Sequence, residues 1–204
     1  MRDKRKKYGK LFDAQLKVLN GIGLDEDRLR LLADKKSKVI ETALGLRIPD
    51  GDYPFIPNID KSPDWHLRRL VTWGSSVRIH SDIKTVSDQI EVQPLSFTYG
   101  INDGYCVRYL TFEETKEKFE ETNVSSLIFK ELVMYKILAS QPETGFGCHV
   151  CDEVVALGST ISNKERKLFI PGFYSDYNNE ELVTDSIYFP SKAGRSAPFC
   201  LKRV

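Results

Sequence analysis

The chain has 204 residues, of which 41% are hydrophobic and 29% are charged, and its formal net charge is +1. This composition is typical of a folded globular chain and excludes wholesale disorder. No run reaches 18 apolar residues, which excludes a membrane-spanning helix, and near-neutrality gives no overall reason to expect a nucleic acid or a membrane as partner.

The charges are unevenly distributed along the chain. Residues 1–10 carry six bases and one acid, residues 141–185 carry eight acids and three bases, and residues 191–204 carry four bases and no acid. We interpret the basic ends as solvated, or folded onto the acidic segment, rather than as a nucleic-acid patch. No apolar stretch follows the basic start, so we expect no secretory signal and no disulfide framework.

Residues 1–45 predict an N-terminal helical hairpin. Apolar residues recur at helical spacing from Tyr8 to Leu19, and Gly21 follows them as a stop signal. A second helix is expected from Asp25, a candidate N-cap, to Gly45. The remaining residues, 46–204, are expected to form one α+β domain.

The middle of the chain mixes strand and helix signals. Residues 53–59 predict an edge strand or extended segment because of their prolines, and Ser62 followed by Pro63 predicts a helix start. Residues 95–99 and 105–110 alternate in polarity around a turn signal at 102–104, which predicts a β-hairpin. Thr111 and Glu114 have the spacing of a capping box.

Residues 125–139 are apolar on nearly every side, with Ser125 as the expected cap. A helix of this kind is buried, so we expect it at the centre of the fold. The last third of the chain holds short strand candidates at residues 154–157, 167–170, 186–189 and 199–201. The predicted fold class is therefore α+β, with the helical hairpin followed by a small antiparallel or mixed sheet packed on the buried helix.

Several short segments resemble a family of uncharacterised bacterial cytoplasmic proteins, a domain of unknown function. They are residues 53–57, 109–114, 157–160, 169–171 and 196–200, and the similarity extends over most of residues 5–204. The resemblance implies a bacterial origin and a cytoplasmic location. It implies no catalytic residues.

Cys148 and Cys151 form the sharpest local motif. Two thiolates at this spacing are the usual half of a tetrahedral zinc site. Completion of the site needs Cys106 and Cys200, or a histidine. The histidines are His66, His80 and His149. No second pair of this spacing exists, so we favour small buried cysteines and keep a zinc-stabilised module as an alternative.

Candidate catalytic residues are few. His80 and Asp82 alternate on a predicted strand and therefore share one face, and His149 lies between the two motif cysteines. No complete catalytic motif is present. A hydrolase that acts on a nucleotide or a nucleic acid, with its site among His80, Asp82, His149, Cys148 and Cys151, remains the enzymatic alternative.

One aromatic residue lies beside two arginines, at Trp65, Arg68 and Arg69. This combination suits base stacking and phosphate contact, although a core tryptophan with solvated arginines is the more common arrangement. Because no catalytic constellation is complete, the first functional hypothesis is a non-enzymatic binding or interaction protein of bacterial cytoplasm. The helical hairpin would serve as its docking arm.

Overall fold

The computed structural model describes residues 2–72, 77–79, 86–139, 141, 144, 154–162, 168–176, 179–186 and 196–204. The helices are α1 (Arg2–Gly21), α2 (Glu26–Ala33), α3 (Lys36–Gly45), α4 (Pro63–Thr72), α5 (Phe112–Thr122) and α6 (Phe129–Ala139), with a short 3-10 helix, η2, at Tyr105–Val107. The strands are β1 (Tyr53–Pro57), β2 (Val77–Ile79), β3 (Val86–Asp88), β4 (Phe97–Asn102), β5 (Ser125–Ser126), β6 (Val154–Val155), β7 (Ser159–Ser162), β8 (Leu168–Asp176), β9 (Asn179–Ser186) and β10 (Phe199–Arg203).

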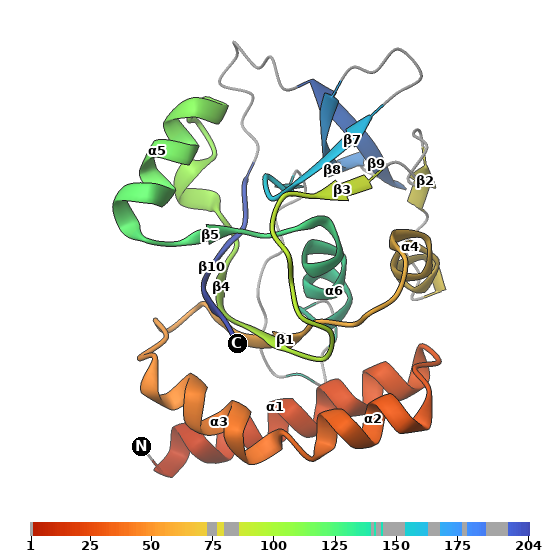
Figure 1. The fold of residues 1–204 in the computed structure, drawn as a ribbon, viewed down its shortest axis with the longest axis vertical. Coiled ribbons are helices and arrows are strands. Elements are labelled where there is room, and N and C mark those ends of the chain that lie inside the picture. Colours follow the sequence, from red (N-terminus) through yellow and green to blue (C-terminus); the bar gives the residue numbers. More distant parts are fainter. Residues whose placement is uncertain are drawn as a thin grey trace.

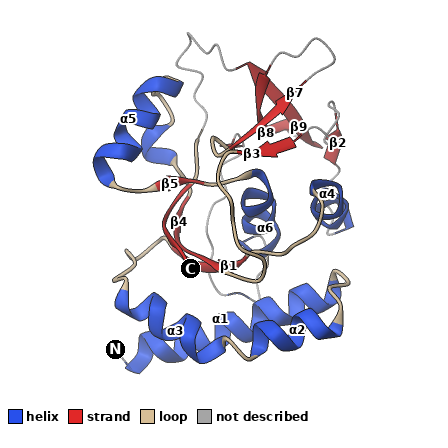
Figure 2. Cartoon of the chain, in the orientation of Figure 1, coloured by secondary structure: helices blue, strands red, loops and turns tan. Residues whose placement is uncertain are grey.

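These elements are arranged in layers (Figure 1). Helices α1, α2 and α3 form a helical layer at one end, and α1 and α3 pack on a four-stranded antiparallel sheet of order β1-β4-β10-β5. Helix α6 lies on the other side of this sheet. A second sheet of order β2-β9-β8-β7-β3, with β6 paired to β8, follows beyond α6, as the colouring by secondary structure makes clear (Figure 2).

Helix α1 is held on the first sheet by an aromatic cluster. The ring of Phe12 stacks on Phe97 at 6.0 Å, and the ring of Tyr8 meets Phe55 edge-on at 5.9 Å. Gln15 is also buried on this face, where its amide donates a 2.7 Å hydrogen bond to the Phe55 carbonyl. The buried stripe of α1 is therefore the one that the helical spacing predicted.

Helix α6 is buried on all sides, which confirms the predicted central helix. Its Tyr135 ring packs against Tyr53 of the first sheet at 5.7 Å, and its Phe129 ring stacks on Phe173 of the second sheet at 6.0 Å. The helix begins at Phe129, however, and not at residue 125. Ser125 is no cap, because it pairs with Cys200 in the short strand β5.

The α+β fold class is confirmed. Among the local predictions, the helix caps are confirmed and the single second helix of the hairpin is wrong. Asp25 caps α2, and Thr111 and Glu114 form the predicted capping box of α5. The expected second helix of the hairpin is two helices, α2 and α3, because residues 34–35 interrupt it.

The strand expected at residues 105–110 is absent, and η2 begins there instead. Gly104 has a left-handed φ of +74°, which turns the chain away from β4. The neighbours of β4 are β1 and β10, so the predicted hairpin does not form.

Candidate functional site

The outward face of α1 carries a row of bases. Because Tyr8, Phe12 and Gln15 point into the core, positions on the opposite side of the helix face solvent. Four of these positions are basic and exposed, and we call them the basic stripe: Arg2, Lys6, Lys10 and Lys17. At 1.5 Å per residue the stripe is about 22 Å long.

No residue of the basic stripe forms an ion pair with any described residue, whereas bases beside the stripe do. Lys36 pairs with Asp13 at 2.6 Å, Lys4 pairs with Asp50 at 3.5 Å, and Arg5 pairs with Glu41. Within the stripe, positions 2, 6 and 10 are one turn apart and carry like charges. Each such contact destabilises a helix by about 0.2–0.5 kcal/mol.

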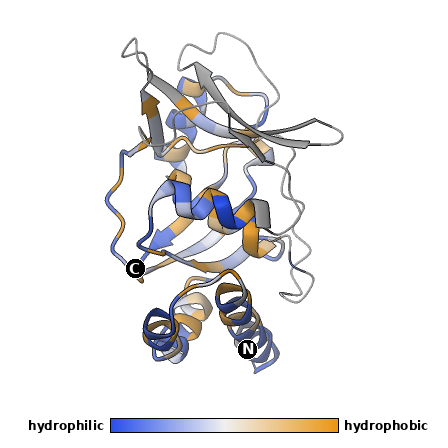
Figure 3. Cartoon of the chain, turned by 90° about the vertical axis from the view of Figure 1, so that its right-hand side faces the viewer, coloured by the Kyte–Doolittle hydropathy of each residue, from blue (hydrophilic) through white to orange (hydrophobic). Residues whose placement is uncertain are grey.

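The stripe belongs to a layer with a strong excess of positive charge. Residues 2–47 hold 13 Lys and Arg against 7 Asp and Glu, a net charge of +6, whereas residues 48–204 hold 17 against 22, a net charge of −5. Seen along the helices, the outer sides of the helical layer are hydrophilic (Figure 3). The near-neutral total therefore conceals a basic layer on an acidic body.

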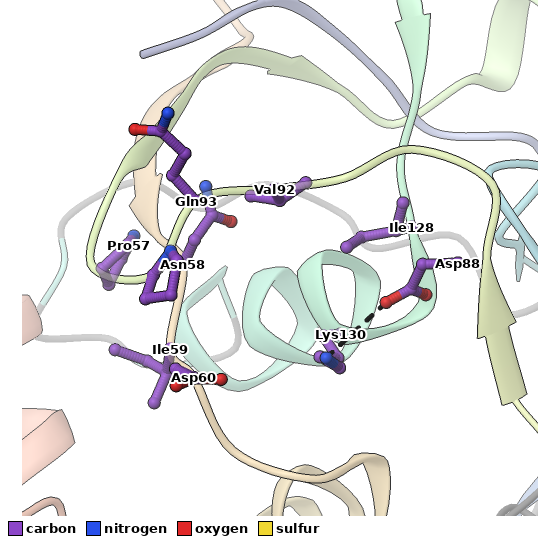
Figure 4. A pocket seen from close by; sticks show the side chains of 10 residues that line it. Pro57, Asn58, Ile59, Asp60, Asp88, Val92, Gln93, Ile128 and Lys130 are labelled. Atoms are coloured by element: carbon purple, nitrogen blue, oxygen red, sulfur yellow. Dashed lines mark ion pairs between the residues drawn. The ribbon is translucent and has the colours of Figure 1, made fainter.

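A shallow pocket lies at the start of α6, and its empty volume of about 410 Å³ includes its open mouth. Figure 4 shows its walls, which come from three segments: the chain after β1, the loop after β3 and the first turn of α6. The polar residues around it are Asn58, Asp60, Asp88, Gln93 and Lys130.

Several polar side chains of this pocket form hydrogen bonds or ion pairs with other groups of the protein. The Asn58 amide donates to the hydroxyls of Ser96 and Thr98 at 2.9 and 3.1 Å. Asp88 accepts a 2.6 Å hydrogen bond from Ser159 and lies 3.6 Å from the Lys130 ammonium. Ser159 is fully buried, and its oxygen also accepts from the Phe129 amide, so it is held as a structural group and not as a nucleophile.

His66 on α4 is fully buried, and burial lowers its pKa to about 4. Its Nδ1 lies 2.9 Å from the Ser62 carbonyl and therefore carries the proton, while its Nε2 has no hydrogen-bond partner among the described residues. No described carboxylate contacts the ring to orient it. A neutral histidine in this setting is a packing residue.

The aromatic and basic residues of α4 contact one another. The Arg69 guanidinium lies over the Trp65 ring, 5.3 Å from its centroid, and Arg68 pairs with Asp64 at 2.7 Å. The structure thus brings Trp65 and Arg69 together, but Arg69 covers one face of the ring. A base would have to displace this arginine to stack there.

The cysteine and histidine candidates are only partly described. Cys106 is exposed on η2, whereas Cys200 is buried in the core, where burial raises the pKa of its thiol to about 12. No group of three or more potential metal ligands occurs among the described residues. Cys148, Cys151, His149, His80 and Asp82 lie outside the described residues, so their roles stay predictions.

A buried ion pair between Glu131 and Arg203 escaped the sequence analysis. Glu131 is a charged residue within an otherwise apolar helix, and this contrast was the available signal. Its carboxylate also accepts hydrogen bonds from Thr98 at 2.5 Å and from the Ile128 amide at 3.0 Å. The network joins α6 to β4 and β10, which makes it part of the scaffold.

Comparison with known proteins adds no relative: no family model, no curated protein and no solved structure matches the chain. Among the described helices, none combines the length and the apolar character needed to cross a membrane.

Proposed function

We propose that this protein is a non-enzymatic binding protein whose helical layer holds the phosphate backbone of a nucleic acid. The observation that carries the proposal is the basic stripe of α1, whose four exposed bases have no acidic partner among the described residues. Phosphate contacts by Lys and Arg supply most of the affinity in sequence-independent binding.

The stripe differs from an ordinary solvated helix face in two ways. Three of its like charges, Arg2, Lys6 and Lys10, repeat at i, i+4 spacing, which costs the helix stability. The surrounding layer has a net charge of +6, so the single exposed acid on this side of α1 beyond its first turn, Asp13, leaves the field positive. The spacing of one helical turn, about 5.4 Å, presents the charges in one line along a rigid element. A rod-shaped polyanion complements such a line better than a compact anion does.

The test measures binding of the full chain to a fluorescently labelled duplex DNA and to a labelled single-stranded RNA. Fluorescence anisotropy gives the binding constant K at each of a series of salt concentrations. With four phosphate contacts, log K should fall against log salt with a slope of about −3 to −4 on the duplex. Neutralisation of three of the bases, in Lys6→Gln/Lys10→Gln/Lys17→Gln, should weaken binding at least tenfold and reduce the slope by about 3.

The matched control removes three lysines from the acidic body, in Lys116→Gln/Lys118→Gln/Lys202→Gln. Both triple variants lower the net charge by the same amount, so a loss confined to the α1 variant would assign binding to the stripe. Equal weakening in both variants, or no binding of either nucleic acid at low salt, would contradict the proposal.

The proposal keeps the bacterial cytoplasm as the setting, because the sequence resemblance implies it. A zinc-stabilised module and a hydrolase remain predictions that depend on Cys148, Cys151, His149, His80 and Asp82. Zinc bound by the cysteines would be compatible with the binding function, since it would act on a different part of the chain.

A further inference from the structure

The acidic body carries a stripe that mirrors the basic one. Helix α5 buries Thr115 and Phe119, and its outward positions hold exposed glutamates. Three of them repeat at i, i+4, i+8, and we call them the acidic stripe: Glu113, Glu117 and Glu121. None of the three is in an ion pair with a described residue, so this helix also retains unfavourable like-charge neighbours.

The two stripes match in spacing and in length. Positions 2, 6 and 10 of α1 are separated by eight residue steps in total, as are positions 113, 117 and 121 of α5, so each row is about 12 Å long with charges one turn apart. Helices α1 and α5 lie at opposite ends of the molecule, so they cannot pair within one chain (Figure 1).

Two exposed tyrosines precede the acidic stripe in the sequence. Tyr105 and Tyr109, in the segment that leads into α5, are 55% and 62% exposed, and the Arg108 guanidinium lies 5.7 Å from the Tyr105 ring centroid. Ion pairs at a surface contribute little by themselves. Tyrosines that can be desolvated at a contact are the residue type that supplies binding energy to such a face.

From these observations we propose that the α5 face of one molecule docks along the basic stripe of a second copy of the same chain. The contact pairs different surfaces of the two copies, so it is head-to-tail and can continue to further copies. A nucleic acid on the basic stripe would cover the same charges, and it would therefore dissociate the copies. The inference goes beyond nucleic-acid binding, and it stands if that binding fails.

The experiment is sedimentation velocity of the full chain at several protein concentrations, at about 0.01 M and about 1 M salt. The sedimentation coefficient should rise with concentration at low salt and stay constant at high salt. A wild-type chain that remains monomeric at low salt would overturn the inference.

Charge reversal makes the test specific. Arg2→Glu/Lys6→Glu/Lys10→Glu reverses the basic stripe, and Glu113→Lys/Glu117→Lys/Glu121→Lys reverses the acidic one. Each variant alone should stay monomeric at low salt, because its two faces then carry like charge, and an equimolar mixture of the two should associate again.

A third variant, Glu26→Lys/Asp60→Lys/Glu91→Lys, gains the same charge at exposed positions outside the acidic stripe. Association of the α1 variant with this control as strong as with the α5 variant would show general attraction between charged molecules and would overturn the inference. Far-ultraviolet circular dichroism of each variant checks that the helices persist.

Discussion

Arg203 and Glu131 form a bidentate ion pair that connects strand β10 to the first turn of the central helix α6. The guanidinium Nε lies 2.8 Å from Oε1 and Nη2 lies 2.7 Å from Oε2. Burial alone would lower the pKa of Arg203, but its hydrogen bonds to Glu131 and the charge of that carboxylate raise it, so the arginine stays charged. Two charges that are 72 positions apart in sequence thus meet inside the fold.

Removal of the arginine should strongly destabilise the protein. Arg203→Met would leave the Glu131 carboxylate buried without its counter-charge, and we expect the free energy of unfolding to fall by about 3–5 kcal/mol in urea titrations. The neighbouring Lys202→Met is the control, because Lys202 is exposed, and its effect should stay below about 0.5 kcal/mol. Equal losses in the two variants would show that the ion pair contributes nothing specific.

His66 should make stability depend on pH. Its pKa is about 4 in the folded protein and 6.5 in the unfolded chain, so the unfolded chain takes up this proton first as the pH falls. The stability from His66 is therefore complete above pH 6.5 and is lost progressively towards pH 4, by about 2 kcal/mol between neutrality and pH 5. Urea unfolding at about pH 7.5 and about pH 5 measures this difference.

The control for this prediction is His66→Asn, whose side-chain amide can still donate to the Ser62 carbonyl but does not titrate. The variant should lose less stability than the wild type between the two pH values, whatever its stability at neutrality. Asp25 also has a lowered pKa, mainly because the Arg28 backbone amide donates a hydrogen bond to it. Since Asp25 is present in both proteins, it does not contribute to the difference between them. An identical pH dependence in the two proteins would rule out His66 as its source.

Gly104 is required by a close backbone approach. Its φ is +74°, and a Cβ at this position would lie 2.2 Å from the Ala197 carbonyl oxygen. Gly104→Ala should therefore cost more than about 2 kcal/mol, since left-handed strain and a backbone clash both oppose it.

Gly23→Ala is the matched control for that substitution. Gly23 has a similar φ of +81°, but its nearest neighbour would be the flexible Arg69 side chain at 3.6 Å. This variant should show the strain alone, about 1 kcal/mol. If thermal unfolding shows the same loss for both, the contact between Gly104 and the 197–198 segment is looser than the structure indicates.

Features set by neighbouring residues could be predicted from the sequence, and features set by distant ones could not. The caps at Asp25 and Thr111 need only residues three positions away, and the buried stripe of α1 follows from its spacing. The alternation at 105–110 predicted a strand, but the left-handed Gly104 and the packing of the 197–198 segment on it override that pattern.

The same distinction applies to the candidate site. The six bases in residues 1–10 are evident in the sequence, and they were interpreted as solvated or folded onto acidic residues. Which of them lack an acidic partner depends on contacts between helices, such as the pairing of Arg5 with Glu41 on α3. The basic stripe is set by the side of α1 that faces solvent and by the absence of acidic partners for its bases among the described residues, and both depend on how α1 packs in the fold.

The two described cysteines should differ sharply in reactivity. A thiol must ionise to attack a disulfide reagent, and the buried Cys200, whose pKa is raised to about 12 by burial, does not ionise in the folded state at neutral pH. Cys106 is exposed. Labelling with an aromatic disulfide, followed by peptide mass spectrometry, should therefore modify Cys106 within seconds to minutes and Cys200 only on unfolding.

The surroundings of Cys200 bear on the zinc hypothesis. Cys200 is fully buried, and no group of three or more potential metal ligands occurs among the described residues, so we predict that Cys200 is not a zinc ligand. Elemental analysis of untagged protein gives the metal content, and Cys200→Ala should leave that content unchanged. If about one zinc per chain is present and is lost on Cys200→Ala but not on Cys106→Ala, the buried thiol is a ligand after all. If zinc is present and only Cys148→Ala and Cys151→Ala remove it, those cysteines hold the metal with ligands other than Cys200.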